Sequence, residues 1–90
     1  MTRPKDEDVK VKRLTPYDSR SIRVGFDSKT LGTFMEVPVD TSTVVAAGLK
    51  QGSKITLSFF PNGRLATVFC GRYACWQSDR LGLGLDGTDY

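Results

Sequence analysis

Apolar and polar residues alternate along much of this chain, and a period of two is typical of β-strands with one buried face. Near the N-terminus, Val9 and Val11 alternate with Lys10 and Lys12. Lysines on the outward face are typical of a strand at the edge of a sheet. The pattern therefore predicts a short edge strand from residue 9, followed by a turn over residues 15–19.

Two longer alternations predict an antiparallel pair of strands. In the first, Ile22, Val24 and Phe26 share one face, with Arg23 and Gly25 on the other. In the second, one face holds Leu31, Thr33, Met35, Val37 and Val39, and the other holds Gly32, Phe34, Glu36 and Pro38. Residues 27–30 are expected to form the turn between them. Because Pro38 cannot donate to a ladder, the second strand should end there or lie at an edge.

Residues 40–52 have a different character. Asp40 and the two residues after it are good N-cap types, two alanines follow, and Gly48 suits the left-handed residue that ends a helix. The segment predicts a helix of one or two turns.

The clearest hairpin lies between Lys54 and Cys70, because Asn62-Gly63 is the strongest short-range hairpin signal. A two-residue loop there pairs Phe60 with Leu65 and Leu57 with Val68. In that register the apolar face holds Ile55, Leu57, Phe59, Ala66, Val68 and Cys70. The other face holds Lys54, Thr56, Ser58, Phe60, Leu65, Thr67 and Phe69. The second strand is expected to continue to Gln77, with a bulge at Gly71.

These elements predict a mainly β fold: a small five-stranded antiparallel barrel or curled sheet, of the OB or SH3-like kind, with one short helix between strands 3 and 4. Residues 1–8 are expected to be a flexible charged arm, since they hold little apolar surface to bury. Residues 9–77 form a single β-rich domain in this interpretation, and residues 78–90 a flexible acidic tail rich in Gly and Leu.

Charge weakens the apparent case for nucleic-acid binding. The chain has 90 residues and a formal net charge of +3. Residues 1–23 hold seven cations and four anions, which accounts for the whole excess, while residues 24–90 are neutral. No apolar run approaches the roughly 18 residues of a membrane span. We therefore expect a cytoplasmic protein that does not contact membranes.

The residue types argue against catalysis. The chain has no His and two Cys, so the usual acid/base group is missing and a four-ligand zinc site cannot form from Cys and His. An extended chain would hold Cys70 and Cys75 too far apart for a disulfide, and a bond would need a tight turn over residues 71–74. The extended arrangement, with two reduced thiols, is the one that the pattern favours. We expect no enzyme activity, no catalytic residues, no metal and no cofactor.

The remaining signal is a set of arginine, lysine and aromatic residues on the hairpin and its extension. Trp, Tyr and Arg are enriched at interface hot spots. The predicted binding residues are Lys54, Phe60, Arg64, Phe69, Arg72, Tyr73 and Trp76. They favour a non-enzymatic protein-binding module, such as a small inhibitor or adaptor of the kind that phages and mobile elements encode. The alternative is a nucleic-acid-binding β-barrel that uses the same hairpin and the basic arm. A homodimer formed through an edge strand or the Leu-Gly tail is a third hypothesis.

Overall fold

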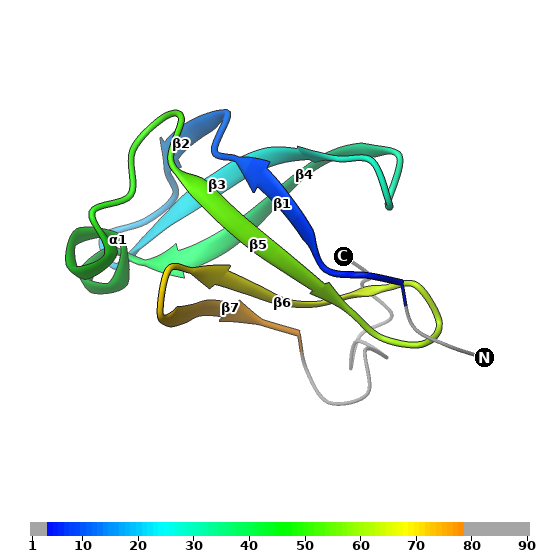
Figure 1. The fold of residues 1–90 in the computed structure, drawn as a ribbon. Coiled ribbons are helices and arrows are strands. Elements are labelled where there is room, and N and C mark those ends of the chain that lie inside the picture. The colour runs from blue at the N-terminus through cyan, green and yellow to red at the C-terminus, as the bar shows by residue number, and fades with distance from the viewer. Residues whose placement is uncertain (1–3, 79–90) are drawn as a thin grey trace.

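A computed structural model describes residues 4–78, which form two antiparallel sheets and one helix (Figure 1). The four-stranded sheet has the order β1-β5-β6-β7, and the three-stranded sheet has the order β2-β3-β4. In chain order the elements are β1 (Glu7–Lys10), β2 (Arg13–Pro16), β3 (Ser21–Ser28), β4 (Thr33–Asp40), α1 (Thr41–Ala47), β5 (Lys54–Phe59), β6 (Leu65–Cys70) and β7 (Tyr73–Gln77).

The two sheets are joined by a bend between β1 and β2. The Val11 N–H donates to the Ser53 carbonyl at 2.8 Å, beside the four-stranded sheet. The next N–H, that of Lys12, donates to the Gly25 carbonyl of β3 at 2.7 Å. Consecutive residues therefore bond to different sheets, and the chain turns from one into the other.

This bend corrects the predicted strand count. The fold is mainly β and antiparallel as expected, but the described chain has seven strands in two sheets and no closed barrel. The bend divides the first predicted strand into β1 and β2, and a turn at Gly71 divides the last into β6 and β7. For the same reason the helix follows the fourth strand, where we expected it after the third. β1 also begins at Glu7, inside the segment expected to be a flexible arm.

The inner faces of both sheets share one hydrophobic core. Its buried side chains are Val11, Val24, Phe26, Val37, Val39, Val44, Ile55, Leu57, Phe59, Leu65, Val68, Cys70 and Cys75. Every strand from β3 to β7 contributes to it, so each sheet buries its apolar face against the other. The helix contributes Val44, and Gly48 ends it at φ 64° as the sequence predicted.

The β3–β4 hairpin confirms the predicted pairing but turns later than expected. Ser28 still pairs with Thr33, so the turn lies beyond residue 28. β4 continues through Pro38 to Asp40, which is possible because β4 lies at the edge of its sheet. Of the two alternatives for Pro38, the edge position is the one observed.

The register of the β5–β6 hairpin differs from the prediction near its tip. Leu57 pairs with Val68 as expected, but Phe59 pairs with Leu65 across a bulge. The Phe60 N–H donates to the Arg64 carbonyl, and the Gly63 N–H donates to the Phe60 carbonyl, each at 2.8 Å. Three residues therefore form the loop, with Gly63 at φ 88°. The bulge buries Leu65 in place of Ala66. Leu65 therefore lies on the core face and Ala66 on the opposite face, the reverse of the prediction.

The prediction of reduced cysteines is wrong in this structure, which holds a Cys70–Cys75 disulfide with a Cα–Cα distance of 5.8 Å. The chain between them is not extended. β6 ends at Cys70, Gly71 adopts φ 65°, and β7 returns to pair Tyr73 with Cys70. A register shift within this pairing lets Cys75 approach Cys70 on the inner side.

A side-chain bridge ties the two sheets at the end remote from α1. The Glu7 carboxylate of β1 accepts hydrogen bonds from the Ser28 hydroxyl at 2.9 Å and from the N–H groups of Lys29 and Thr30 at 2.8 and 3.1 Å. Partial burial raises the pKa of Glu7, but these donors together lower it by more, so its net pKa lies below the ordinary value. The bridge connects β1 to the β3–β4 turn.

Across residues 4–78, no helix is long and apolar enough to cross a bilayer.

Candidate functional site

Residues 4–78 contain no group of three or more His, Cys, Asp or Glu side chains placed to hold a metal ion. Nor does any buried side-chain nitrogen or oxygen in this part of the chain lack a hydrogen-bond partner. Several clusters of charged and aromatic side chains lie on the surface of the described chain.

One such feature covers the outer face of the three-stranded sheet, and we call it the arginine–aromatic face. Pairing between the strands places Arg13 beside Gly25 and Gly25 beside Glu36, while Asp27 lies beside Phe34. The face consists of Lys12, Arg13, Tyr17, Arg23, Asp27, Phe34 and Glu36. Three strands and their flanking residues contribute to it, so one sheet positions all of its side chains.

Phe34 lies at the centre of one half of this face. The Arg13 guanidinium carbon stands 4.9 Å from the ring centroid, and the Lys12 Nζ stands 5.7 Å from it. The ring extends across β3 onto Gly25, where an added Cβ would approach the Phe34 Cζ to 2.6 Å. Gly25 thus provides the space in which the ring packs against the sheet.

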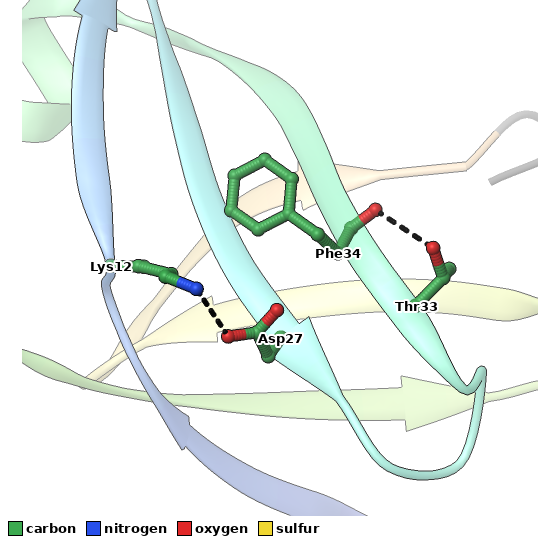
Figure 2. Close-up of polar contacts among 4 residues, drawn as sticks. All are labelled: Lys12, Asp27, Thr33 and Phe34. Atoms are coloured by element: carbon green, nitrogen blue, oxygen red, sulfur yellow. Dashed lines mark hydrogen bonds and ion pairs between the residues drawn. The ribbon is translucent and has the colours of Figure 1, made fainter.

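Figure 2 shows the boundary of this half, where Lys12, Asp27 and Phe34 come from three different segments. The Lys12 ammonium binds the Asp27 carboxylate at 3.0 Å, and both side chains are about 62% exposed. An exposed pair of this kind adds little stability, typically below about 1 kcal/mol. The pair keeps the Lys12 ammonium over the Phe34 ring, 5.7 Å from its centroid.

Tyr17 and Arg23 form the other half. The Arg23 guanidinium carbon lies 4.3 Å from the Tyr17 ring centroid, and the Tyr17 residue is 56% exposed. The turn before β3 is fixed by Asp18, whose carboxylate accepts from the N–H groups of Arg20 and Ser21 at 2.8 Å each. The Arg20 N–H is the largest influence that lowers the pKa of Asp18. A hollow of about 260 Å³ opens between Tyr17, Arg23, Glu36 and Pro38.

Glu36 connects the two halves. Its carboxylate binds the Arg13 Nε at 3.2 Å and lies 3.8 Å from the Arg23 Nη1. The Glu36 side chain is 22% exposed, and the two arginine side chains are 60% and 44% exposed. Both guanidinium groups are therefore held in place while much of their surface stays accessible.

The residues predicted from sequence do not form one site. Phe60 and Arg64 flank the loop at one end of β6, whereas Arg72 and Tyr73 lie in and beside the turn at its other end. The extended strand β6, of six residues, lies between Arg64 and Arg72 and spans about 20 Å. These two arginines cannot contact the same small epitope.

The other predicted residues lie on different faces of the four-stranded sheet. Trp76 pairs with Val68, is half-buried, and packs against the core. Phe69 pairs with Thr56 and is 37% exposed on the outer face. Lys54 lies two residues before Thr56 on that same face and contacts Asp8 at 3.6 Å. Among the predicted binding residues, the fold therefore brings Lys54 close to Phe69. Apart from these two, only residues of the same turn lie together: Phe60 with Arg64, and Arg72 with Tyr73.

The sequence patterns did not point to the arginine–aromatic face, although they placed several of its residues on outward faces of the predicted strands. The alternation already put Arg23 and Gly25 on the face opposite the core, and Phe34 and Glu36 on the corresponding face of the next strand. Only the pairing of the two strands, together with β2, makes these residues neighbours. A search for Arg and aromatic residues on paired outer faces would have found them.

Comparison of the chain with known protein families, with curated proteins and with solved structures finds no match in any of the three. The functional inference therefore depends on the residues and geometry of this chain.

Proposed function

We propose that this protein is a non-enzymatic protein-binding module, acting as an inhibitor or adaptor, and that its contact surface is the arginine–aromatic face. The observation that carries the proposal is the fixed arrangement of Arg13 and Arg23 on Phe34 and Tyr17, with both guanidinium groups held by Glu36. Arg and aromatic residues dominate the hot spots of protein interfaces. Side chains that are already held lose less conformational freedom on binding, which favours affinity.

The charge pattern favours a protein partner over nucleic acid. Three cations of this face, Lys12, Arg13 and Arg23, are interleaved with the two carboxylates of Asp27 and Glu36. Phosphate binding gains from clustered, uncompensated cations, because each phosphate contact releases counterions. A mixed pattern of charges instead suits a protein surface with complementary charges of both signs.

Affinity capture with matched baits tests this proposal. Immobilised wild type, an Arg23→Ala, Phe34→Ala double variant, and an Arg72→Ala control would each be incubated with lysate of the source cells, with and without nuclease. We expect a protein that wild type and control retain, that the double variant loses by at least about tenfold, and that resists nuclease. Circular dichroism of each bait verifies that it is folded.

Two results would refute the proposal. Equal recovery of every captured protein by all three baits would show that this face is not the contact surface. Capture that disappears after nuclease treatment would favour nucleic-acid binding, and direct titration with oligonucleotides at two salt concentrations would then measure the expected steep salt dependence.

A further inference from the structure

The two guanidinium groups of the arginine–aromatic face share a single carboxylate. The Glu36 side chain accepts a hydrogen bond from the Arg13 Nε at 3.2 Å, and it lies 3.8 Å from the Arg23 Nη1. One negative charge therefore faces two positive charges. The remaining cation of the face, Lys12, has its own partner in Asp27 at 3.0 Å (Figure 2). The face as a whole holds three cations and two carboxylates, which leaves one positive charge unmatched.

The carboxylates that border this face do not supply the missing negative charge. Asp18 lies in the turn before β3, where its Oδ1 accepts three hydrogen bonds, from the Arg20 N–H and from the N–H and hydroxyl of Ser21. Asp40 ends β4 and borders a different hollow, which Arg20 also lines. Neither carboxylate lines the hollow of the arginine–aromatic face. The unmatched positive charge is thus left for a group from another molecule.

Most hydrogen-bond donors of the two guanidinium groups are unused. An arginine side chain carries several N–H donors on one planar group. Within residues 4–78, Arg13 donates one side-chain hydrogen bond, to Glu36, and Arg23 donates none. The Phe34 and Tyr17 rings pack against the two groups, with the guanidinium carbons 4.9 and 4.3 Å from the ring centroids. The remaining donors are therefore held in position and open to a ligand.

The hollow beside Arg23 has room for one side chain. Its volume is about 260 Å³. Pockets that take a whole small molecule typically measure about 300 to 1,000 Å³, so this hollow is smaller than such a site. Arg23 and Glu36 form its polar part, and Tyr17 and Pro38 form its apolar part. This lining suits a side chain with an apolar stem and an acidic end, as Asp and especially Glu have.

We propose that Arg23, with Arg13 beside it, binds the carboxylate of an Asp or Glu side chain on the partner protein. The inference rests on the proposed function and names the chemistry that the partner presents. A guanidinium group donates to a carboxylate through two parallel bonds, which are shorter and stronger than bonds between neutral groups. The stem of the acidic side chain would lie against Tyr17 and Pro38.

A carboxylate fits the charge of this site better than a phosphoryl group does. A phosphorylated side chain carries about −1.5 to −2 at pH 7, which exceeds the single unmatched positive charge, and Glu36 would repel the excess. A carboxylate brings one negative charge and leaves the face neutral.

NMR titration with capped amino acids tests the assignment on the full chain. The probe is N-acetyl-glutamate amide, which carries one carboxylate, and the comparison is N-acetyl-glutamine amide, which has the same shape without the charge. The measured signals are the side-chain Nε–H groups of Arg13, Arg23 and Arg72 at low ionic strength. We expect the glutamate probe to shift the Arg13 and Arg23 signals along saturating curves, and to shift the Arg72 signal far less. The glutamine probe should bind at least about tenfold more weakly.

Variants separate recognition by the planar group from attraction by charge alone. Arg23→Lys keeps the charge but loses the planar group, and should bind the glutamate probe at least about fivefold more weakly, as followed through the Arg13 signal. The matched control, Arg72→Lys, makes the same change at an exposed position outside the face and should stay within about twofold of wild type. Glu36→Gln should instead bind the probe about threefold more tightly, because a competing negative charge is gone. The backbone amide spectrum of each variant verifies that it is folded.

A bait without the two arginines connects the probe to the partner. The double variant Arg13→Gln, Arg23→Gln keeps the Tyr17 and Phe34 rings and joins the other baits in the affinity capture. We expect it to lose the captured protein by at least about tenfold. If it retains a protein that the Arg23→Ala, Phe34→Ala bait loses, the partner contacts the rings. The carboxylate assignment is then wrong, while the proposed function stands.

The titration has outcomes that overturn the inference without any partner. They are equal binding of the two probes, equal shifts at Arg72 and Arg23, unchanged binding by Arg23→Lys, and an affinity of Glu36→Gln that is unchanged or lower. Tighter binding of N-acetyl-phosphoserine amide than of the glutamate probe would assign the site to a phosphorylated side chain instead. If every bait recovers the same proteins, the proposed function fails and the partner's carboxylate fails with it. The titration then shows separately whether the site binds carboxylates.

Discussion

Removing the charge of Glu7 should weaken the connection between the two sheets. Glu7→Gln keeps the size of the side chain but replaces one carboxylate oxygen with an NH₂ group. In the native protein, Oε1 accepts from Ser28 and Thr30, and Oε2 accepts from Lys29. The amide oxygen can substitute for one of these acceptors, while the NH₂ group then faces an N–H donor. The variant therefore loses at least one hydrogen bond and the charge that strengthens the others.

The expected magnitude follows from the surroundings of these donors. A hydrogen bond to a charged group contributes roughly 1.5 to 3 kcal/mol to stability. Ser28 is only 4% exposed, but Lys29 and Thr30 are exposed, so water can replace part of what their N–H groups lose. We expect Glu7→Gln to reduce the free energy of unfolding by about 1 to 2 kcal/mol at pH 7. In a domain of this size, that corresponds to a fall in Tm of roughly 4 to 16 °C.

The pH dependence gives a sharper test. The pKa of Glu7 is lowered in the folded state from its ordinary value of 4.5. A carboxylate with a lowered pKa stabilises the fold fully above its unfolded pKa, and this contribution is lost as pH falls through the folded pKa. The difference between wild type and Glu7→Gln should therefore be largest above pH 4.5 and shrink below it.

Urea denaturation of both proteins at pH 7 and at about pH 3, followed by circular dichroism, measures this difference. Asp6→Asn is the matched control, because it removes an exposed neighbouring charge and should change stability by less than about 0.5 kcal/mol. A Glu7→Gln effect no larger than that of the control, or one that stays constant down to pH 3, would contradict the proposed bridge.

Three further sets of substitutions probe the disulfide, the bulge between β5 and β6, and the C-terminal end of α1. Replacing Cys70 and Cys75 together with Ser removes the constraint on a six-residue loop, and should cost about 2 kcal/mol in urea denaturation; an unchanged midpoint, or two titratable thiols in the non-reduced wild type, would contradict the disulfide. Leu65→Ala should cost about 2 to 5 kcal/mol because Leu65 is 1% exposed, whereas Ala66→Ser should be nearly neutral; the reverse order in thermal melts would support the register without the bulge. Gly48→Ala should destabilise the protein by about 1 kcal/mol, because Gly48 holds φ 64° at the end of α1. Ala46→Gly, at an exposed helical position, should cause a loss of similar size through lower helix propensity. A stabilised Gly48→Ala variant would exclude the left-handed cap.

Local patterns in the sequence determined most of the secondary structure. The alternation at Ile22, Val24 and Phe26 specified β3 and its buried face, since a strand turns every second side chain to the same side. The sequence also placed the short helix correctly: Asp40 precedes its first turn, although the Asp40 side chain makes no capping hydrogen bond, and Gly48 ends it in the left-handed conformation. These features depend on the backbone preferences and periodicity of neighbouring residues, which a sequence displays directly.

Tertiary structure decided the features that depend on contacts between distant residues. The bend at Val11 and Lys12 exists because one N–H bonds near β5 and the next bonds β3, and no local pattern encodes that change of partner. The bulge that buries Leu65, and the turn that brings Cys75 to Cys70, likewise depend on how the strands fill a shared core. The arginine–aromatic face has the same origin. Its residues come from positions 12 to 36, and only the pairing of three strands places Arg13 and Arg23 on either side of Glu36.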